Sequence, residues 1–545
     1  MQRFRPFPLT VMRYSRLSPL CTPRHRDGTK RWAYALALSA ALLMLAPAML
    51  ATPVAAAATV SNCNDSGGGS LRTAIATGGT ITFTTDCPAT SPIKLTSGSL
   101  MIGVNLAIDG TGHTIVVDGN NAVSVFTVSA YRASLTNLTI QHGNGGSGPG
   151  GGISAARGGG SSLALINTTV TNNQAAFGGG IYIATGALTL TNSTVSNNTA
   201  GNGNGIGGGI YCAGCSRSAI STSGLDVTGS TISGNRATTN VGGILVVDAA
   251  MTMTNSTVSG NTAAGQAGGI ETFQAANNAS FTLVQSTISG NSAATGNGIV
   301  IRASPPPTIQ NSIINNDCTG TGSVASAGYN IDNSGGTCHL TGTGDRSGDP
   351  GIGPLANNGG PTQTYLPLTG SQAIDQIPNT GGCNGAGVAT DQRGVARPQP
   401  AGGLCDIGSV EVQATAPTVT GIAPSSGPTT GGSRVTITGT GFQSGLTVRF
   451  GGPSGSTATI VSVSSTQIIL TTPAHTAGTV DVVITNPDNG VFTLPNGYTY
   501  GIANPLPATR SPGPPVLGSP PPLPPTRPGP PPSGGPPAPA PTPRS

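Results

Sequence analysis

One 13-residue phrase occurs five times in the middle of this chain. The copies begin at Leu163, Leu188, Leu225, Met251 and Phe281, at spacings of 25, 37, 26 and 30 residues, and each is followed by a Gly-rich break and an Ile. Spacings of this size are typical of solenoids. Apolar residues alternate at the first and third positions of each copy, as in Leu188 and Leu190. This alternation predicts a short strand with one buried face.

Each repeat predicts three strands. The second strand centres on the β-branched eighth residue, such as Val195, and the third follows the glycines, as in Ile181–Ile183. The windows are rich in Thr, Val, Ser, Asn and Gly, which are mediocre or poor helix formers, so a helical repeat is not expected. Because a single coil cannot bury its inward face, the coils must stack in parallel register.

An Asn recurs at the eleventh position of every copy. In a stacked solenoid these side chains would lie above one another and form a hydrogen-bonded amide ladder. We therefore expect a structural role, and no chemistry, for Asn173, Asn198, Asn235, Asn261 and Asn291.

The region from about Ser70 to Asp317 resembles a right-handed parallel β-helix of the pectate lyase-like superfamily. Its opening, Ser70 to Ile75, is similar to the SLREAI-type start of bacterial surface β-helix proteins, with Thr73 where that motif usually has Glu. We therefore expect an all-β chain, in which residues 59–344 form a three-sided right-handed parallel β-helix.

The N-terminal residues predict export. A basic segment ending in Lys30-Arg31 precedes an apolar run from Trp32 to Leu50, and small residues at 55–58 complete a signal peptide pattern over residues 1–58. An uncleaved membrane anchor is the alternative, since the apolar run is nearly long enough to span a bilayer. Cleavage would leave a secreted or cell-surface protein without a membrane span.

Eight of the nine cysteines follow the predicted signal peptide. An even number of cysteines in an exported chain indicates disulfides, and sequence proximity predicts four pairs. These pairs are Cys63 with Cys87, Cys212 with Cys215, Cys318 with Cys338, and Cys383 with Cys405.

Three further segments follow the repeats. Residues 345–413 contain phrases such as Asn358–Thr362, Ser371–Asp375 and Asp391–Gly394, which resemble the closing segment of choice-of-anchor β-helix proteins, and we expect them to cap the solenoid. Asp375, Asp391, Arg393 and Asp406 form the densest charge cluster there, for which structural ion pairing is the favoured explanation and a cation or catalytic site the alternative.

Residues 417–500 alternate short β-branched runs with Gly and Pro turns, which predicts a small β-sandwich. Gly431-Gly432, Gly439 to Phe442 and Thr485 to Pro487 resemble an IPT/TIG immunoglobulin-like domain, and that resemblance implies a spacing or binding role. The Pro-rich residues 501–545 predict a disordered tail, as the basic N-terminus predicts a disordered start.

Charge argues against two functions. Residues 1–58 hold eight Lys or Arg and one Asp, so the remaining chain has 15 basic and 17 acidic residues, a net charge of 15 − 17 = −2. A nucleic-acid partner is therefore not expected. The superfamily resemblance implies a polysaccharide lyase or glycoside hydrolase, but between Leu135 and Asn316 the only acids are Asp226, Asp248 and Glu271. Such enzymes need paired carboxylates, or a base with cation-binding carboxylates.

We therefore expect no catalytic residue, metal or cofactor, and favour a monomeric, non-catalytic scaffold or adhesin that binds a glycan or a cell-envelope component. The lyase or hydrolase stays open as the alternative. Tyr182 and Tyr211 fall at equivalent places in consecutive coils, where their rings could stack on sugars, with Glu271 on the same face. Surface aromatics that merely cover the sheet are the other explanation.

Overall fold

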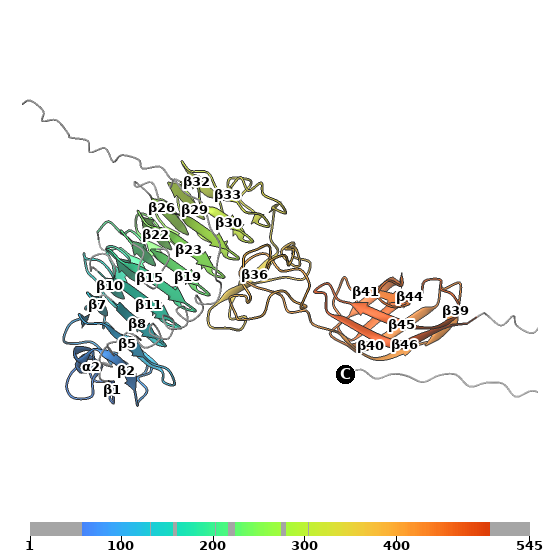
Figure 1. The fold of residues 1–545 in the computed structure, drawn as a ribbon, viewed down its shortest axis with the longest axis horizontal. Coiled ribbons are helices and arrows are strands. Elements are labelled where there is room, and N and C mark those ends of the chain that lie inside the picture. The colour runs from blue at the N-terminus through green and yellow to red at the C-terminus, as the bar shows by residue number, and fades with distance from the viewer. Residues whose placement is uncertain are drawn as a thin grey trace, which may run out of the picture. The chain divides into compact units, whose positions relative to one another are not determined.

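The computed structural model describes residues 57–130, 132–155, 161–201, 203–215, 224–273, 280–302 and 305–501, which fold mostly as β-structure in two compact units (Figure 1). One unit is a parallel β-solenoid with about nine turns in the described part of residues 58–315, followed by an irregular segment. The other is a β-sandwich. The predicted fold class is confirmed. The predicted signal peptide up to residue 56 and the predicted tail from residue 502 lie outside the described residues.

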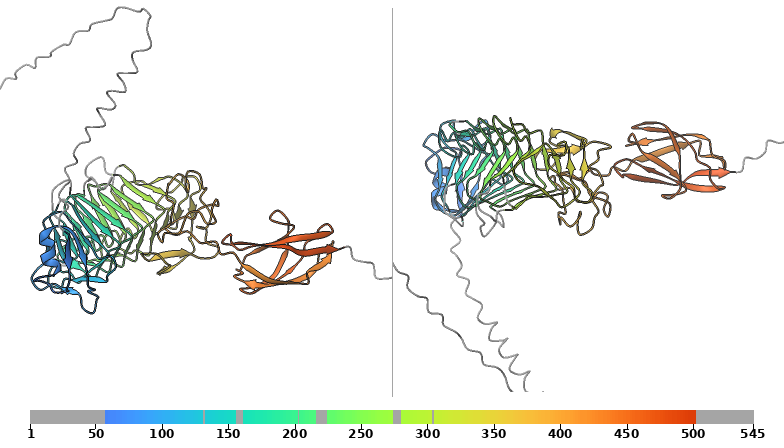
Figure 2. Two further views of the ribbon diagram at one scale, coloured as in Figure 1. Left: turned by 60° about the horizontal axis from the view of Figure 1, so that its bottom comes forward. Right: turned by 90° about the horizontal axis from the view of Figure 1, so that it is seen from above.

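In the described coils, the three predicted strands of each repeat form three long parallel sheets (Figure 2). Sheet A contains β1 (Ala58–Val60), β2 (Gly79–Phe83), β5 (Leu106–Asp109), β8 (Arg132–Thr136), β11 (Ser162–Ile166), β15 (Ala187–Thr191), β19 (Leu225–Thr228), β23 (Met251–Thr254), β27 (Phe281–Val284), β30 (Thr308–Gln310) and β33 (Ala325–Ser326). Sheet B contains β3 (Ile93–Lys94), β6 (Ile115–Asp118), β9 (Leu138–Gln141), β12 (Thr169–Thr171), β16 (Thr194–Ser196), β20 (Thr231–Ser233), β24 (Thr257–Ser259), β28 (Thr287–Ser289), β31 (Ile313–Asn315), β34 (Ile331–Asp332) and β35 (Arg346–Ser347). Sheet C contains β4 (Leu100–Ile102), β7 (Phe126–Val128), β10 (Ile153–Ala155), β14 (Ile181–Ile183), β18 (Ile210–Cys212), β22 (Ile244–Val247), β26 (Ile270–Phe273), β29 (Ile299–Arg302) and β32 (Cys318–Gly320).

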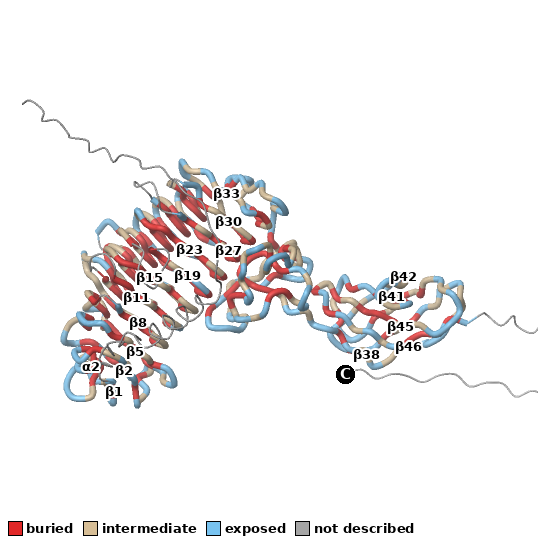
Figure 3. The backbone as a smooth tube through the Cα atoms, in the orientation of Figure 1, coloured by how far each residue is buried: buried red, intermediate tan, exposed pale blue. Residues whose placement is uncertain are grey.

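Alternation along each strand builds the core. Leu188 pairs in register with Leu225, and Leu190 with Val227, so that each inward side chain lies on its counterpart in the next coil. These stacked side chains are fully buried, whereas the turns between the strands are more exposed (Figure 3). The solenoid interior is therefore one continuous apolar column.

Amide and hydroxyl side chains form ladders at two corners of each coil. At the corner after sheet B, the Asn173 Nδ2 donates to Asn198 Oδ1 at 2.9 Å, and the same bond links successive coils through Asn235, Asn261, Asn291 and Asn316. Between sheets A and B, backbone N–H groups donate to hydroxyls along Thr168, Ser193, Ser230, Ser256, Ser286 and Ser312. The hydroxyl ladder was not predicted, although the sixth residue of every copy is Ser or Thr, just as the eleventh is always Asn.

Two elements of the solenoid were not predicted. A small sheet D follows the Asn corner and contains β13 (Gln174–Ala175), β17 (Thr199–Ala200), β21 (Arg236–Ala237) and β25 (Thr262–Ala263). The SLREAI-like segment forms helix α2 (Leu71–Thr77), which lies beside β1 at the first end of the solenoid. Ser70 starts this helix because its hydroxyl accepts the Thr73 N–H, and Leu71 and Ile75 pack on the core.

Four disulfides join the predicted pairs, Cys63–Cys87, Cys212–Cys215, Cys318–Cys338 and Cys383–Cys405. Three lie in the solenoid and the last lies in the segment that follows it. Disulfides persist in oxidising compartments, so their presence indicates an oxidising, extracellular type of environment.

Residues 349–413, which we call the brace, pack along the side of the solenoid on sheet B. Within the brace, β36 (Ile352–Ala356) pairs with β37 (Thr364–Pro367). Its contacts with sheet B begin in the coil of Thr231 and continue to that of Asn311. We expected this segment to cap the open end of the solenoid. Its polar groups bond to the outward Thr of sheet B, and its Ile377 and Ile407 pack on Ile313 and Ile331 of the last coils.

The second unit is a sandwich of two sheets. One contains β38 (Thr418–Ala423), β40 (Arg434–Thr440), β43 (Thr459–Ser464) and β44 (Gln467–Thr471); the other contains β39 (Ser426–Pro428), β41 (Thr447–Phe450), β42 (Ser456–Thr457), β45 (Gly478–Thr485) and β46 (Val491–Gly501). Alternating residues such as Val435, Ile437 and Ile468 fill its core, together with the edge-to-face rings of Phe450 and Tyr498.

Candidate functional site

The outward face of sheet C carries the three predicted ligand-binding residues. Parallel pairing places Tyr182 of β14 beside Tyr211 of β18, and the same row continues to Leu245, Glu271 and Val300. Since neighbouring strands are about 4.8 Å apart, Glu271 lies two strands, or about 10 Å, beyond Tyr211. The three residues therefore occupy one face, as predicted, but do not form one compact pocket.

Aromatic rings gather at one part of this row. The centroids of Tyr182 and Tyr211 lie 5.4 Å apart with the ring planes at 90°. Phe177, from the turn before β14, lies 6.3 Å from Tyr211 at 55°. Both tyrosines are half-buried, and burial raises the pKa of the Tyr211 phenol, with a further contribution from Tyr182. The result is a fixed aromatic cluster with part of its surface in solvent.

Aliphatic side chains extend the apolar surface from the rings along the solenoid. Val241, Leu245, Ala267 and Val300 form a cluster outside the main core, and the partly buried Ile206 and Tyr211 pack against it. This outward apolar strip departs from the Thr and Ser that dominate the outward rows of sheets A and B. These four side chains are buried, between 0% and 7% exposed, so the solvent-accessible part of the strip consists of the partly buried Ile206, Tyr211 and Val247.

Glu271 forms an ion pair on the apolar strip. Its Oε1 accepts the Arg302 Nε–H at 2.9 Å, and Arg302 also donates to Gln266. Glu271 is only 8% exposed and lies between Leu245 and Val300. The guanidinium of Arg302 thus holds the carboxylate in position.

The other solenoid acids lie on different surfaces. Asp226 lies on sheet A, between Thr189 and Thr252, and Asp248 follows β22 in a left-handed turn with φ 50°. Pairing the coils therefore separates both residues from the Glu271 row. Within the residues that the structure describes, no three His, Cys, Asp or Glu side chains are grouped so that they could hold a metal ion.

Two histidine–aspartate pairs in the first coils were not predicted from the sequence. His142 Nδ1 lies 2.8 Å from Asp118 Oδ2, and His113 Nδ1 lies 3.4 Å from Asp86 Oδ1. Burial alone would raise the pKa of Asp118, but hydrogen bonds from His142 and Gln141 hold it below its usual value. Each pair joins adjacent coils, so only the coil register could have revealed it.

Hydrogen bonds and ion pairs connect the charge cluster of the brace. Asp391 forms a 2.8 Å ion pair with Arg393 and accepts the Glu411 N–H, while Asp406 accepts the N–H groups of Asp375 and Val412. Arg397 and Glu411 form a fully buried ion pair at 2.9 Å, which was not predicted from the sequence. Burial raises the pKa of Asp406 to about 6 and that of Glu411 to about 7. Because these carboxylates accept bonds mainly from the brace backbone, they hold together a segment with little regular secondary structure.

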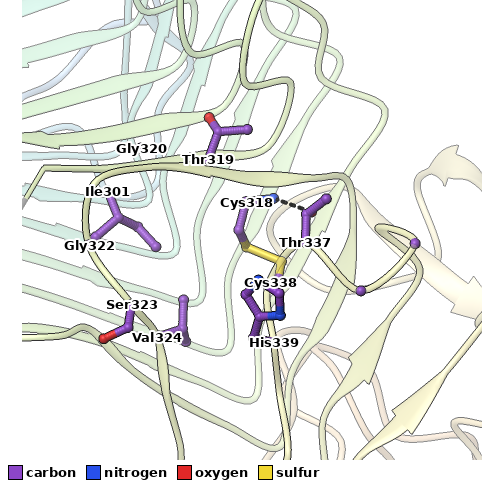
Figure 4. A pocket seen from close by; sticks show the side chains of 12 residues that line it. Ile301, Cys318, Thr319, Gly320, Gly322, Ser323, Val324, Thr337, Cys338 and His339 are labelled. Atoms are coloured by element: carbon purple, nitrogen blue, oxygen red, sulfur yellow. Dashed lines mark hydrogen bonds between the residues drawn. A yellow bond between two sulfur atoms is a disulfide. The ribbon is translucent and has the colours of Figure 1, made fainter.

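A pocket of about 390 Å³ lies at the last coil of sheet C (Figure 4). The Cys318–Cys338 disulfide and Ile301 form part of its lining, and Thr337 accepts the Cys318 N–H at 3.0 Å. His339 also lines the pocket and has a left-handed backbone, with φ 49°. The pocket is where the stack of coils ends.

The described residues include no helix with both the length and the apolar character that crossing a bilayer requires. Residues 417–500, which form the sandwich, match the model of the IPT/TIG domain family. A search of the curated proteins finds no match to the chain.

Proposed function

We propose that this chain is an exported, non-catalytic binding protein of the cell surface or the extracellular medium, and that the outward face of sheet C binds a glycan. The observation that carries the proposal is the fixed cluster of Tyr182, Tyr211 and Phe177 in consecutive coils. Aromatic faces bind the C–H groups of sugar rings, and tyrosine hydroxyls supply hydrogen bonds beside them.

The rest of the row suits an elongated ligand. A sugar chain that follows the solenoid axis from the tyrosines would pass Leu245 and reach the Glu271–Arg302 pair. This pair offers acceptors and donors without a large net charge, which favours a neutral glycan. The four disulfides and the resemblance of residues 417–500 to surface spacing modules support an extracellular setting.

The experiment is affinity electrophoresis of the intact protein in gels that contain soluble neutral or acidic polysaccharides. We expect retardation by at least one neutral polysaccharide. Tyr182→Ala and Tyr211→Ala should each weaken binding about tenfold, which corresponds to about 1.4 kcal/mol. Tyr182→Phe should keep most of the affinity, because the ring remains.

Met101→Ala is the matched control. Met101 is 59% exposed and lies on β4 of the same sheet, three strands before Tyr182 of β14. Equal retardation of the wild type and both Tyr→Ala variants would contradict the proposal. Release of reducing ends, or of unsaturated uronates detected by ultraviolet absorbance, would instead establish the polysaccharide lyase or hydrolase alternative.

A further inference from the structure

A row of amide side chains lies along the corner between sheets A and B, with one interruption. The row comprises Asn167, Asn192, Gly229, Asn255, Gln285 and Asn311, and all six residues have left-handed backbones with φ between 45° and 61°. Asn and Gly tolerate this conformation better than other residues. Among these six described residues, Gly229 alone has no side chain.

A pocket of about 190 Å³ lies beside Gly229. The solenoid contributes Asn192, Thr228, Gly229 and Asn255, and the brace contributes Pro361 and residues 390–394. The Asn192 carboxamide leans over the gap, since its Oδ1 lies 2.4 Å from where a Cβ on residue 229 would be. The pocket thus occupies the space that an amide side chain fills in the neighbouring coils.

Hydrogen bonds fix the brace beside this gap. Thr362 Oγ1 donates to the Gly229 carbonyl oxygen at 3.0 Å, and Asn255 Nδ2 donates to the Thr390 carbonyl oxygen. Gln392 is buried behind them and donates to Thr231 and Thr362 at 2.8 and 2.9 Å. The walls of the pocket are therefore preformed.

The lining is polar and has no net charge. Asp391 and Arg393 are 0% and 8% exposed in their side chains and form a 2.8 Å ion pair with each other. The exposed Thr228, Thr390 and Pro361 line the mouth, with the Asn192 amide beside them. Hydroxyl and amide groups around a small apolar surface match a neutral polyhydroxyl ring, whereas a charged ligand would find no opposite charge that is not already paired.

We propose that this pocket binds one neutral sugar residue, at a site separate from the tyrosine row. Its volume equals that of about six water molecules, at about 30 Å³ each. A single hexose ring fits such a volume and can replace the hydrogen bonds of the water that it displaces.

Gly229→Asn tests the proposal by restoring the amide row. Asn adopts this backbone conformation at equivalent positions, and the nearest atom to its Cβ would be the terminal Oδ1 of Asn192 at 2.4 Å, which would have to turn aside. The probes are D-glucose, D-galactose, D-mannose and N-acetyl-D-glucosamine, measured with the intact protein by saturation-transfer NMR and calorimetry. We expect at least one of them to bind the wild type, and at least tenfold weaker binding to Gly229→Asn.

Gly234→Asn is the matched control. Gly234 belongs to the same coil, has φ 63°, and a Cβ there would meet Asn197 Oδ1 at 2.6 Å, but this residue does not line the pocket. Gly234→Asn should bind sugar as the wild type does. No binding of any of the four sugars to the wild type, or equal binding by the two Asn variants, would overturn the proposal.

Asn192→Gly provides a second test if Gly229→Asn does not fold. This substitution keeps the left-handed backbone, removes the amide, and should also weaken sugar binding; unchanged affinity would contradict the proposal. Tyr182→Ala should leave this binding unchanged. The pocket and the tyrosine row can therefore fail or succeed independently.

Discussion

Each Asn of the ladder uses both ends of its carboxamide. In Asn235, Oδ1 accepts the Asn198 backbone N–H at 3.0 Å and its side-chain N–H at 2.9 Å, while Nδ2 donates to the Val195 carbonyl and to Asn261. The sequence could predict this ladder because identical residues at one repeat position must stack in a parallel solenoid. A smaller residue would leave the buried Asn198 backbone N–H and one of its side-chain N–H groups without their acceptor.

Asn235→Ala should destabilise the solenoid by about 3 kcal/mol, since a buried donor or acceptor without a partner costs about 1 to 3 kcal/mol. Chemical denaturation followed by circular dichroism measures this change. Asn333→Ala is the control, because that side chain makes an exposed hydrogen bond to Asn315 and its loss should cost less than about 0.5 kcal/mol. Equal effects of the two substitutions would show that the ladder contributes little.

The buried carboxylates of the brace should make its stability depend on pH. Because burial raises the pKa of Asp406 to about 6 and that of Glu411 to about 7, the folded brace binds protons more tightly than the unfolded chain. The contribution of these two groups to stability is fully present below the usual carboxyl pKa values and is lost as the pH rises through about 6 to about 7.

Thermal melts of the solenoid unit from about pH 4.5 to about pH 7.5 span both pKa values. The midpoint temperature should decrease as the pH rises. Asp406→Asn lowers stability overall, because its amide N–H would face a backbone N–H, but it should flatten this pH dependence. A midpoint that rises with pH, or an unchanged slope in the variant, would contradict this assignment.

Among the elements, the strands of the coils follow from local sequence and the brace does not. Inward alternation, β-branched residues and Gly breaks specify sheets A, B and C one repeat at a time. The brace depends on contacts between residues more than 100 positions apart, such as Thr257 with Gln392 at 2.7 Å, and no local pattern encodes them. The Glu271–Arg302 pair and the sugar-sized pocket were missed for the same reason, since both require the coil register or the position of the brace.

Gln392 connects the brace to two coils, because it donates to Thr231 and accepts from Thr257. Gln392→Ala should remove these bonds and destabilise brace docking by about 2 to 3 kcal/mol. Hydrogen–deuterium exchange should then increase in residues 349–413 more than in the first coils. Gln413→Ala is the control, because Gln413 is an exposed residue at the end of the same segment. Unchanged exchange in the brace of Gln392→Ala would show that other contacts hold it.

In the molecule as a whole, the two units have separate hydrophobic cores, and the described disulfides all belong to the solenoid unit. All four disulfides lie between Cys63 and Cys405, and the core of the sandwich contains Val435, Ile437 and Tyr498. A protein with two cores need not unfold in one transition.

Calorimetry should resolve two transitions, and reduction of the disulfides should lower only the one that belongs to the solenoid unit. Ile437→Ala should lower the midpoint temperature of the other transition, because loss of a large buried side chain reduces the free energy of unfolding of the sandwich by about 2 to 5 kcal/mol. The assignment fails if reduction shifts both transitions equally.

The brace also limits how such a chain can change in length during evolution. Its partners Thr231, Thr257, Thr287 and Asn311 belong to four successive coils. A coil duplicated among these four would put the later partners out of reach, whereas one duplicated between Thr139 and Ser196 would leave every brace contact intact. Lineages of this chain should therefore vary in coil number on the N-terminal side of Thr231 and keep it constant beyond.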